Sequence, residues 1–280
     1  MSRISSGRCA VADALKPVRP GTTPSLHDRD ADAPHWVPGD DELAAATRAL
    51  LARASTLQGM LFAEHRKALL FVLQGRDAAG KDGLIRKVFT ALHPQGLSAS
   101  SFSVPTPEEA AHDFLWRLRC ALPAFGQVGV WNRSHYEDIL VPRVHHTLPA
   151  KVWKARYDRI NQFEEDVAAS GVHIVKLFIH ISREEQLARF RDRASDSGSQ
   201  WKLQASDLRD RAAWPKFTKA YHDIIRKCNT RESPWYLVPA DHKPVRDYLV
   251  ASLLVKHLER LDPTPPPADP ALLKAVAALT

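Results

Sequence analysis

The nine residues from Gly75 to Gly83, GRDAAGKDG, constrain the fold of this chain more than any other stretch. They follow a short apolar segment, residues 67–74, which is typical of a buried parallel strand. They precede residues 84–92, where apolar side chains recur at helical spacing. The glycines therefore lie at a predicted strand-to-helix turn, and their G-x4-G-K spacing is that of a phosphate-binding loop.

This loop offers a phosphate group several kinds of contact. Backbone N–H groups wrap around the anion, the start of the following helix adds positive potential, and the Lys81 ammonium reaches the transferring phosphate. Asp82 stands where a magnesium-binding Ser or Thr is usual, and it either binds metal or caps the helix. Besides Lys81, the predicted phosphate-binding residues of the loop are Gly75, Ala78, Ala79, Gly80, Asp82 and Gly83.

Asp77 lies inside the loop, where a carboxylate beside a bound phosphate is unfavourable unless a cation lies between them. We therefore predict that Asp77 binds a magnesium ion or positions the attacking phosphate oxygen. The alternative is a turn-forming aspartate that accepts a hydrogen bond from its own backbone.

A second polar stretch, Asn132 to Asp138, follows the apolar residues 127–131. Ligands of parallel α/β sheets bind at the carboxyl ends of the strands, so we expect this stretch to face the loop. Arg133 is predicted to lie beside the phosphates, because a guanidinium fork matches phosphate oxygens. The alternative for the stretch is a polar cap with charges that face solvent.

Three residues of the same stretch are predicted to bind the nucleotide: Asn132, Tyr136 and Glu137. Glu137 is one helical turn beyond Arg133, and its carboxylate suits the exocyclic amine of a base. Asn132 is neutral, so any contact with a metal ion is expected through its carbonyl oxygen or a water molecule.

Strands and helices alternate along the chain, which predicts an α/β protein with three layers and a parallel sheet. We expect strands at 67–74, 97–102, 127–131, 172–180 and 235–239. We expect helices at about 41–63, 84–92, 107–122, 150–169, 183–193, 206–211, 213–229 and 245–261, with an irregular segment at 138–149. Residues 1–39 are predicted as an extended arm that docks through Trp36, residues 40–262 as the phosphotransferase domain and residues 263–280 as a loose tail.

Most of the net positive charge lies between Arg183 and Arg231, where 12 Lys and Arg stand against 7 Asp and Glu. In a phosphoryl-transfer enzyme such a stretch is a natural lid, because it closes cations over the phosphates. Arg189 and Arg193 are four residues apart on one predicted helix face, and we expect them to bind phosphate together with Lys202. The alternative is a pair of solvated basic helices.

The whole chain has 280 residues and a net charge of +7, which indicates an anionic partner. Its three cysteines show no C-x-x-C spacing, which argues against a disulfide framework or a zinc site. No run of 18 apolar residues or apolar leader is present, so we expect a cytoplasmic protein with no membrane partner.

Six segments, in this order and spacing, resemble the polyphosphate kinase 2 family. They are GRDAAGKDG at 75–83, HPQG at 93–96, FLWRL at 114–118, NRSHYEDILVPRVH at 132–145, RINQFE at 159–164 and PWYLVPADHK at 234–243. The asparagine at 132 and the run YED resemble the class III members of that family.

The resemblance implies a P-loop kinase fold like that of thymidylate kinase, with a five-stranded parallel sheet and a helical lid. It implies a cytoplasmic bacterial enzyme that transfers the terminal phosphate of inorganic polyphosphate to AMP or ADP, with Mg²⁺ or, as a substitute, Mn²⁺. It also implies a homo-oligomer, either a dimer or a tetramer, that binds no nucleic acid. By the same matching, Asp77, Lys81 and Arg133 fall on the catalytic motifs, and Arg189 and Arg193 fall on the lid.

Two positions depart from the family pattern: Ser103 stands where lysine is common, and Leu84 stands where threonine is common. Two other functions stay open from the residues alone, an ATP-dependent nucleoside monophosphate kinase and a nucleotide-binding module without transfer activity. No His or Cys stands at the strand ends as a nucleophile, so we expect direct in-line transfer.

Overall fold

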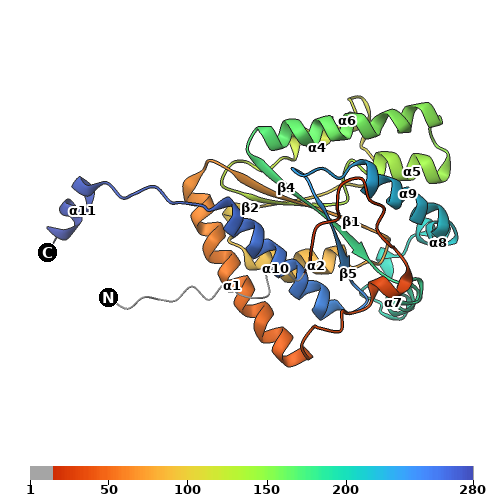
Figure 1. Ribbon diagram of the computed structural model, residues 1–280, viewed down its shortest axis with the longest axis horizontal. Coiled ribbons are helices and arrows are strands. Elements are labelled where there is room, and N and C mark those ends of the chain that lie inside the picture. The colour runs from red at the N-terminus through yellow and green to blue at the C-terminus, as the bar shows by residue number, and fades with distance from the viewer. Residues whose placement is uncertain (1–14, 280) are drawn as a thin grey trace.

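A five-stranded parallel sheet in the order β2-β3-β1-β4-β5 forms the centre of the molecule (Figure 1). The structure is a computed structural model, and it describes residues 15–279. The strands are β1 (Ala68–Gly75), β2 (Leu97–Ser101), β3 (Val128–Asn132), β4 (Val172–His180) and β5 (Trp235–Pro239). The predicted three-layer α/β fold with its five-stranded parallel sheet is confirmed.

Helices cover both faces of the sheet, as the apolar sequences of β1 and β4 require. One face packs against α1 (Asp40–Glu64), α2 (Lys81–Val88) and α10 (Lys243–Leu261). The other face packs against α5 (Glu137–His145), α6 (Ala150–Ala169) and α9 (Trp214–Lys227). The remaining elements are α3 (Pro107–Ala110), α4 (Trp116–Cys120), α7 (Arg183–Ser195), α8 (Ala205–Ala212), α11 (Pro270–Ala277) and the 3-10 turns Asp28–Ala31, Phe89–Ala91, Pro94–Gly96 and Gln200–Lys202.

The helix predicted over 107–122 is wrong, because the chain leaves the helix after α3 and re-enters it only at α4. Asp113 lies between them and accepts a hydrogen bond from the Leu115 N–H at 3.1 Å. Its carboxylate also pairs with Arg159 of α6. These contacts fix a turn where the apolar spacing alone predicted a continuous helix.

The segment predicted as irregular, 138–149, instead begins as the helix α5 with Pro142 inside it. Proline lacks an N–H, so it cannot donate to the carbonyl of Asp138 four residues before it. The Arg156 guanidinium of α6 donates to that carbonyl at 2.5 Å and replaces the missing bond.

The described part of the N-terminal arm packs against the body. The Val18 N–H donates to the Trp235 carbonyl at 2.8 Å, and Leu26 and Ala31 are buried. Trp36 is 45% exposed, so its predicted docking on the body stays a prediction. Residues 1–14, the rest of the predicted arm, lie outside the described residues.

The C-terminal tail is not wholly loose, because it forms α11, which Figure 1 shows apart from the body. Its Asp269 caps the helix by accepting from the Ala271 N–H at 2.8 Å. Residue 280 lies outside the described residues. Across residues 15–279, no helix combines the length and the apolar character needed to span a bilayer.

Candidate active site

The loop between β1 and α2 depends on two glycines for its shape. Gly80 has a φ of +91°, and a Cβ at that position would lie 2.2 Å from Nη1 of Arg246. A Cβ at Gly75 would lie 2.5 Å from the Ile179 carbonyl oxygen of the neighbouring strand β4. Both positions therefore require glycine, and the loop is held closely against β4 and α10.

Lys81, the first residue of α2, folds back over the loop. Its Nζ donates to the carbonyls of Gly75 at 2.8 Å and Arg76 at 3.1 Å. Burial and, after it, the nearby Arg133 guanidinium lower the pKa of the Lys81 ammonium to about 8, against the opposing effect of Asp77. The ammonium therefore lies at the centre of the loop with little solvent around it.

Arg133 brings the second polar stretch to the loop. Its N–H donates to the Leu73 carbonyl at 3.0 Å, because β3 and β1 are neighbours in the sheet. Its guanidinium pairs with Asp77 at 2.5 Å and with Glu137 at 3.5 Å. Glu137 is the largest cause of a raised pKa for Arg133, whereas burial raises the pKa of Glu137. The two strand ends therefore face each other, as the sheet order requires.

Asn132, the last residue of β3, and Asp82, in the first turn of α2, form a second contact between the β3 end and the loop region. The Asn132 Nδ2 donates to the Asp82 Oδ1 at 2.5 Å. The Asn132 Oδ1 is buried and has no hydrogen-bond partner among the described residues. A pair of oxygen atoms, one carboxylate and one amide, is therefore available beside the loop.

A cleft opens between these charged groups and the helices that follow β3 and β4. Its charged wall comes from the loop and the β3 end, and includes Asp77, Arg133 and Glu137. The opposite wall is formed mostly by apolar and aromatic side chains: Val141, Trp214, Phe217 and Tyr221. Asp210 and Gln186 also line the cleft. The cleft therefore combines a phosphate-binding side with a side suited to an apolar or aromatic ligand group.

Arg76 and Trp214 form a contact that the sequence analysis missed. The Arg76 guanidinium stacks 3.6 Å from the Trp214 ring centroid and donates to the Thr218 Oγ1 at 2.5 Å. Burial lowers the pKa of Arg76 to about 10. This contact links the second residue of the loop to the first turns of α9, which are 138 residues away in the chain.

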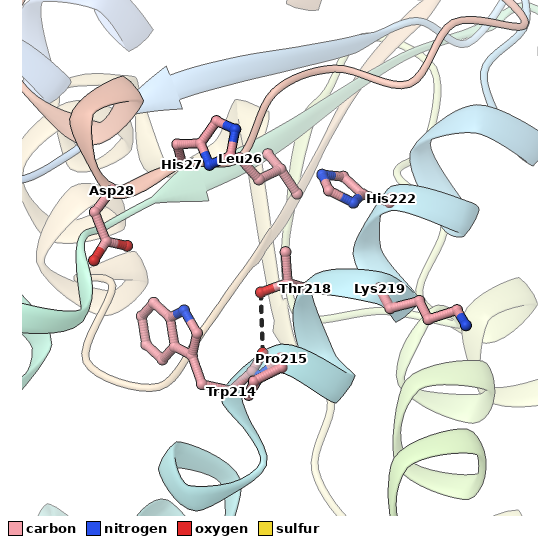
Figure 2. A pocket seen from close by; sticks show the side chains of 8 residues that line it. All are labelled: Leu26, His27, Asp28, Trp214, Pro215, Thr218, Lys219 and His222. Carbon is pink, nitrogen blue, oxygen red and sulfur yellow. Dashed lines mark hydrogen bonds between the residues drawn. The ribbon is translucent and has the colours of Figure 1, made fainter.

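Trp214 also separates the cleft from an outer groove of about 530 Å³ (Figure 2). Figure 2 shows Leu26, His27 and Asp28 of the N-terminal arm on one side and the α9 residues on the other. The arm therefore covers the back of the helix that forms the aromatic wall of the cleft.

Comparisons with known proteins identify the family of this chain. The family model described as "Polyphosphate kinase 2 (PPK2)" matches residues 39–265, most of the chain. The chain belongs to the polyphosphate kinase 2 family. The AMP/ADP-polyphosphate phosphotransferase of Meiothermus ruber is 40% identical over 92% of this chain and 97% of that protein. The ADP-polyphosphate phosphotransferase of Rhodopseudomonas palustris is 38% identical over 81% of this chain and 83% of that protein.

A solved structure of the family has the same fold. Polyphosphate kinase 2 from Arthrobacter aurescens TC1 superimposes with a TM-score of 0.89 at 37% identity, over 96% of each chain. The resemblance inferred from the six sequence segments is therefore confirmed. Its class III component stays a prediction.

The structure contradicts the prediction that Tyr136 binds the nucleotide. Tyr136 is fully buried, and its hydroxyl donates to Glu164 at 2.7 Å, inside the protein body. The nucleotide-binding role of Glu137 stays a prediction. Its carboxylate lies beside Arg133 and lines the cleft next to the loop.

Arg189 is likewise not the solvent-facing phosphate ligand that its spacing predicted. It is 6% exposed, and its guanidinium donates to four carbonyls, those of Ala78, Ala79, Ala240 and Asp241. These contacts fasten the back of the loop to the end of β5. The Ala79 N–H is also used within the loop, where it donates to the Arg76 carbonyl at 3.1 Å.

The phosphate-binding role of the two remaining lid residues, Arg193 and Lys202, stays a prediction. Arg193 is half-buried on α7, one turn beyond Arg189. The Lys202 ammonium lies 5.3 Å from the ring centroid of Trp201, which is 76% exposed. Both cations are therefore accessible to a ligand, in contrast to Arg189.

We expect Arg189→Ala to destabilise the fold, because it leaves loop carbonyls without a donor. The free energy of unfolding should fall by about 2–4 kcal/mol, the range for losing hydrogen bonds to a charged group together with burying unpaired carbonyls. Urea unfolding measures this change. Arg191→Ala, on an exposed position of the same helix, is the control and should change stability by less than about 0.5 kcal/mol. Equal stability of the two variants would contradict this placement.

The depressed pKa of Lys81 predicts a loss of activity on the alkaline side. The ammonium is charged below a pH of about 8 and neutral above it, so kcat/KM should fall as pH rises through that value. A bound phosphate stabilises the ammonium, so kcat should fall only at higher pH. A kcat/KM profile measured with polyphosphate checks this, and a flat profile from about pH 7 to 9.5 would contradict it.

Proposed function

We propose that this chain transfers the terminal phosphate of inorganic polyphosphate directly to AMP, ADP or both. The observation that carries the proposal is the convergence of Lys81 and Arg133 on one loop inside a cleft with an aromatic wall. Family membership and the names of the two relatives described above support the choice of donor and acceptor.

In this proposal the loop holds the donor phosphate while two cations neutralise the charge that develops during transfer. Lys81 lies over the loop, and Arg133 approaches from the β3 end. Asp77 and Glu137 hold the guanidinium between them, so Arg133 is positioned before the substrate arrives. None of the described residues that line the cleft is a His or Cys, which favours transfer without a phosphoenzyme.

We include Mg²⁺ as the cofactor, and the oxygen atoms beside the loop fit it. The unpaired Asn132 Oδ1, the adjacent Asp82 carboxylate and the Asp77 carboxylate are the hard oxygen donors that Mg²⁺ prefers. In the described part of the chain no three His, Cys, Asp or Glu side chains gather as a metal cage. This suits Mg²⁺, which is usually held by one or two carboxylates, waters and substrate phosphates. When bound, the ion neutralises phosphate charge.

The nucleoside of the acceptor is proposed to lie against the aromatic wall of the cleft. Trp214 of α9 offers a ring against which a base can pack, beside the mostly buried Phe217 and Tyr221. Asp210 lies on the same wall and offers a carboxylate to an exocyclic amine. In this proposal these residues take the nucleotide-binding role that the sequence predicted for Tyr136, which the structure places in the core.

A sole-donor assay tests the proposal. Purified protein is incubated with AMP or ADP and Mg²⁺, with either polyphosphate or ATP as the only phosphate donor. We expect ADP or ATP to form with polyphosphate, and much more slowly with ATP as donor. Transfer from ATP alone would instead select a nucleoside monophosphate kinase. Nucleotide binding without transfer from either donor would select a binding module.

The basic lid is proposed to bind the polyphosphate chain, which carries about one charge per unit. Binding should release counterions, so the KM for polyphosphate should rise steeply with salt, whereas the KM for the nucleotide should rise less. Arg193→Ala and Lys202→Ala should flatten the salt dependence, and Arg191→Ala should not. The same salt dependence for both substrates would contradict this role. A homo-oligomeric state and a cytoplasmic location stay predictions from the family resemblance.

A further inference from the structure

Glu164 of α6 is the centre of a buried polar network that the proposed chemistry does not use directly. Its carboxylate is 1% exposed and has three side-chain partners. Oε1 pairs with the His135 Nε2 at 3.0 Å and the Tyr136 hydroxyl at 2.7 Å, and Oε2 pairs with the Lys176 Nζ at 2.5 Å. The network therefore joins α6 and β4 to the turn that follows β3.

Two of these partners lie between two cleft residues. His135 and Tyr136, together with Ser134, separate Arg133 from Glu137 in the chain. All three are buried, whereas Arg133 and Glu137 line the cleft. Each anchored side chain is thus at most two residues from a charged group of the site. A small displacement of His135 or Tyr136 would therefore displace the Arg133 guanidinium.

The turn itself needs such an anchor. Arg133 has a φ of +65°, in the left-handed region, which costs a residue with a Cβ about 1 kcal/mol or more. Strained backbone of this kind persists only where the surroundings determine it strongly. The Arg133 N–H donates to the Leu73 carbonyl of β1. On the other side of Arg133, the Glu164 carboxylate bonds to the side chains of His135 and Tyr136.

The fourth member, Lys176 of β4, makes the network rigid. Its ammonium is completely buried and also donates to the Cys228 carbonyl at 2.6 Å and the Tyr136 hydroxyl at 3.2 Å. The ammonium is thus shared among three acceptors, while the Glu164 carboxylate is shared among three donors. A buried pair of charges is an expensive way to fill a core, whereas apolar residues of the same volume would stabilise it as well or better.

We propose that Glu164 is a positioning residue for phosphoryl transfer, because through His135 and Tyr136 it holds the turn that presents Arg133 to the transferring phosphate. The proposal rests on the function of Arg133 proposed above. Glu164 touches none of the described residues that line the cleft except through this turn. Its role is therefore to fix the position of a catalytic group and not to contact the substrate.

A double-mutant cycle between Tyr136 and Arg133 tests this role, because it separates an effect through Arg133 from a general loss of stability. Tyr136→Phe removes only the hydroxyl and should fold. We expect it to lower kcat about tenfold in the wild-type background, the result of a small misplacement of a catalytic group, with little change in the nucleotide KM. In the Arg133→Lys background the same change should lower kcat less than about twofold.

Tyr236→Phe is the matched control. Tyr236 is also a buried tyrosine, and its hydroxyl bonds to a histidine, His257, at 3.1 Å. His257 belongs to α10, and its hydrogen bonds among the described residues are with His173 and Tyr236, away from the β3 turn, so this control should leave kcat unchanged. An equal effect of Tyr136→Phe in both Arg133 backgrounds, or an equal effect of the two Phe variants on kcat, would overturn the proposal.

The same four proteins are compared by their Kd for tripolyphosphate, measured by calorimetry, because binding needs no turnover. Absence of transfer from polyphosphate would refute the proposed function and leave the positioning role to be decided by the Kd values. We expect Tyr136→Phe to weaken tripolyphosphate binding only where Arg133 is present. Additive Kd changes would refute the positioning role even if the wild-type protein uses polyphosphate.

Discussion

Lys81→Ala is expected to lower kcat at least about a hundredfold, the typical effect of deleting one preorganised electrostatic contact. The ammonium is held over the loop by the Gly75 and Arg76 carbonyls, and no other cation of the loop occupies that position. The fold should survive, because both hydrogen bonds of Lys81 are to the loop itself and because burying the ammonium opposes stability. Steady-state kinetics with polyphosphate and AMP, together with urea unfolding, measure both parts of the prediction.

Lys87→Ala is the control for this loss. Lys87 is in the same helix, α2, but it is exposed and lies at the far end from the loop. Its removal should change kcat less than twofold, as expected for an ordinary surface substitution. If Lys81→Ala keeps more than about a tenth of the wild-type kcat, then Lys81 does not stabilise the transferring phosphate as proposed.

The sheet and the loop could be predicted because their signals are local. An apolar run followed by glycines and an amphipathic helix gives β1, the loop and α2 without any knowledge of distant residues. The break at Asp113 and the helix through Pro142 could not be predicted in this way. Each depends on an arginine of α6, one pairing with the Asp113 carboxylate and one with the Asp138 carbonyl.

The facing of the loop and the β3 end could also be predicted, because carboxyl ends of parallel strands meet at one edge of the sheet. The directions of individual side chains could not. Tyr136 and Arg189 are polar residues that the sequence alone places at the surface, yet both are buried because partners distant in the chain satisfy them. Tyr136 is bonded to Glu164, and Arg189 is bonded to the loop and the end of β5.

The buried partners of Glu164 predict a large loss of stability when its carboxylate is removed. We expect Glu164→Ala to lower the free energy of unfolding by about 3–5 kcal/mol, the cost of leaving a buried charge without its partner. Lys176 would keep only the Cys228 carbonyl and the Tyr136 hydroxyl, and neither is charged. His135 and Tyr136 would lose the same acceptor. Urea unfolding at neutral pH measures the change.

Two variants separate the buried charge from other causes of destabilisation. Glu165→Ala changes an exposed residue at the next position of α6 and should alter stability by less than about 0.5 kcal/mol. The double variant Glu164→Leu with Lys176→Met removes both charges and should recover most of the lost stability, because apolar groups of similar volume can replace a buried pair. It should not recover kcat, since His135 and Tyr136 still lack their acceptor. Recovery of both properties would show that the pair serves only the fold, and recovery of stability alone would show that its carboxylate also positions the catalytic turn.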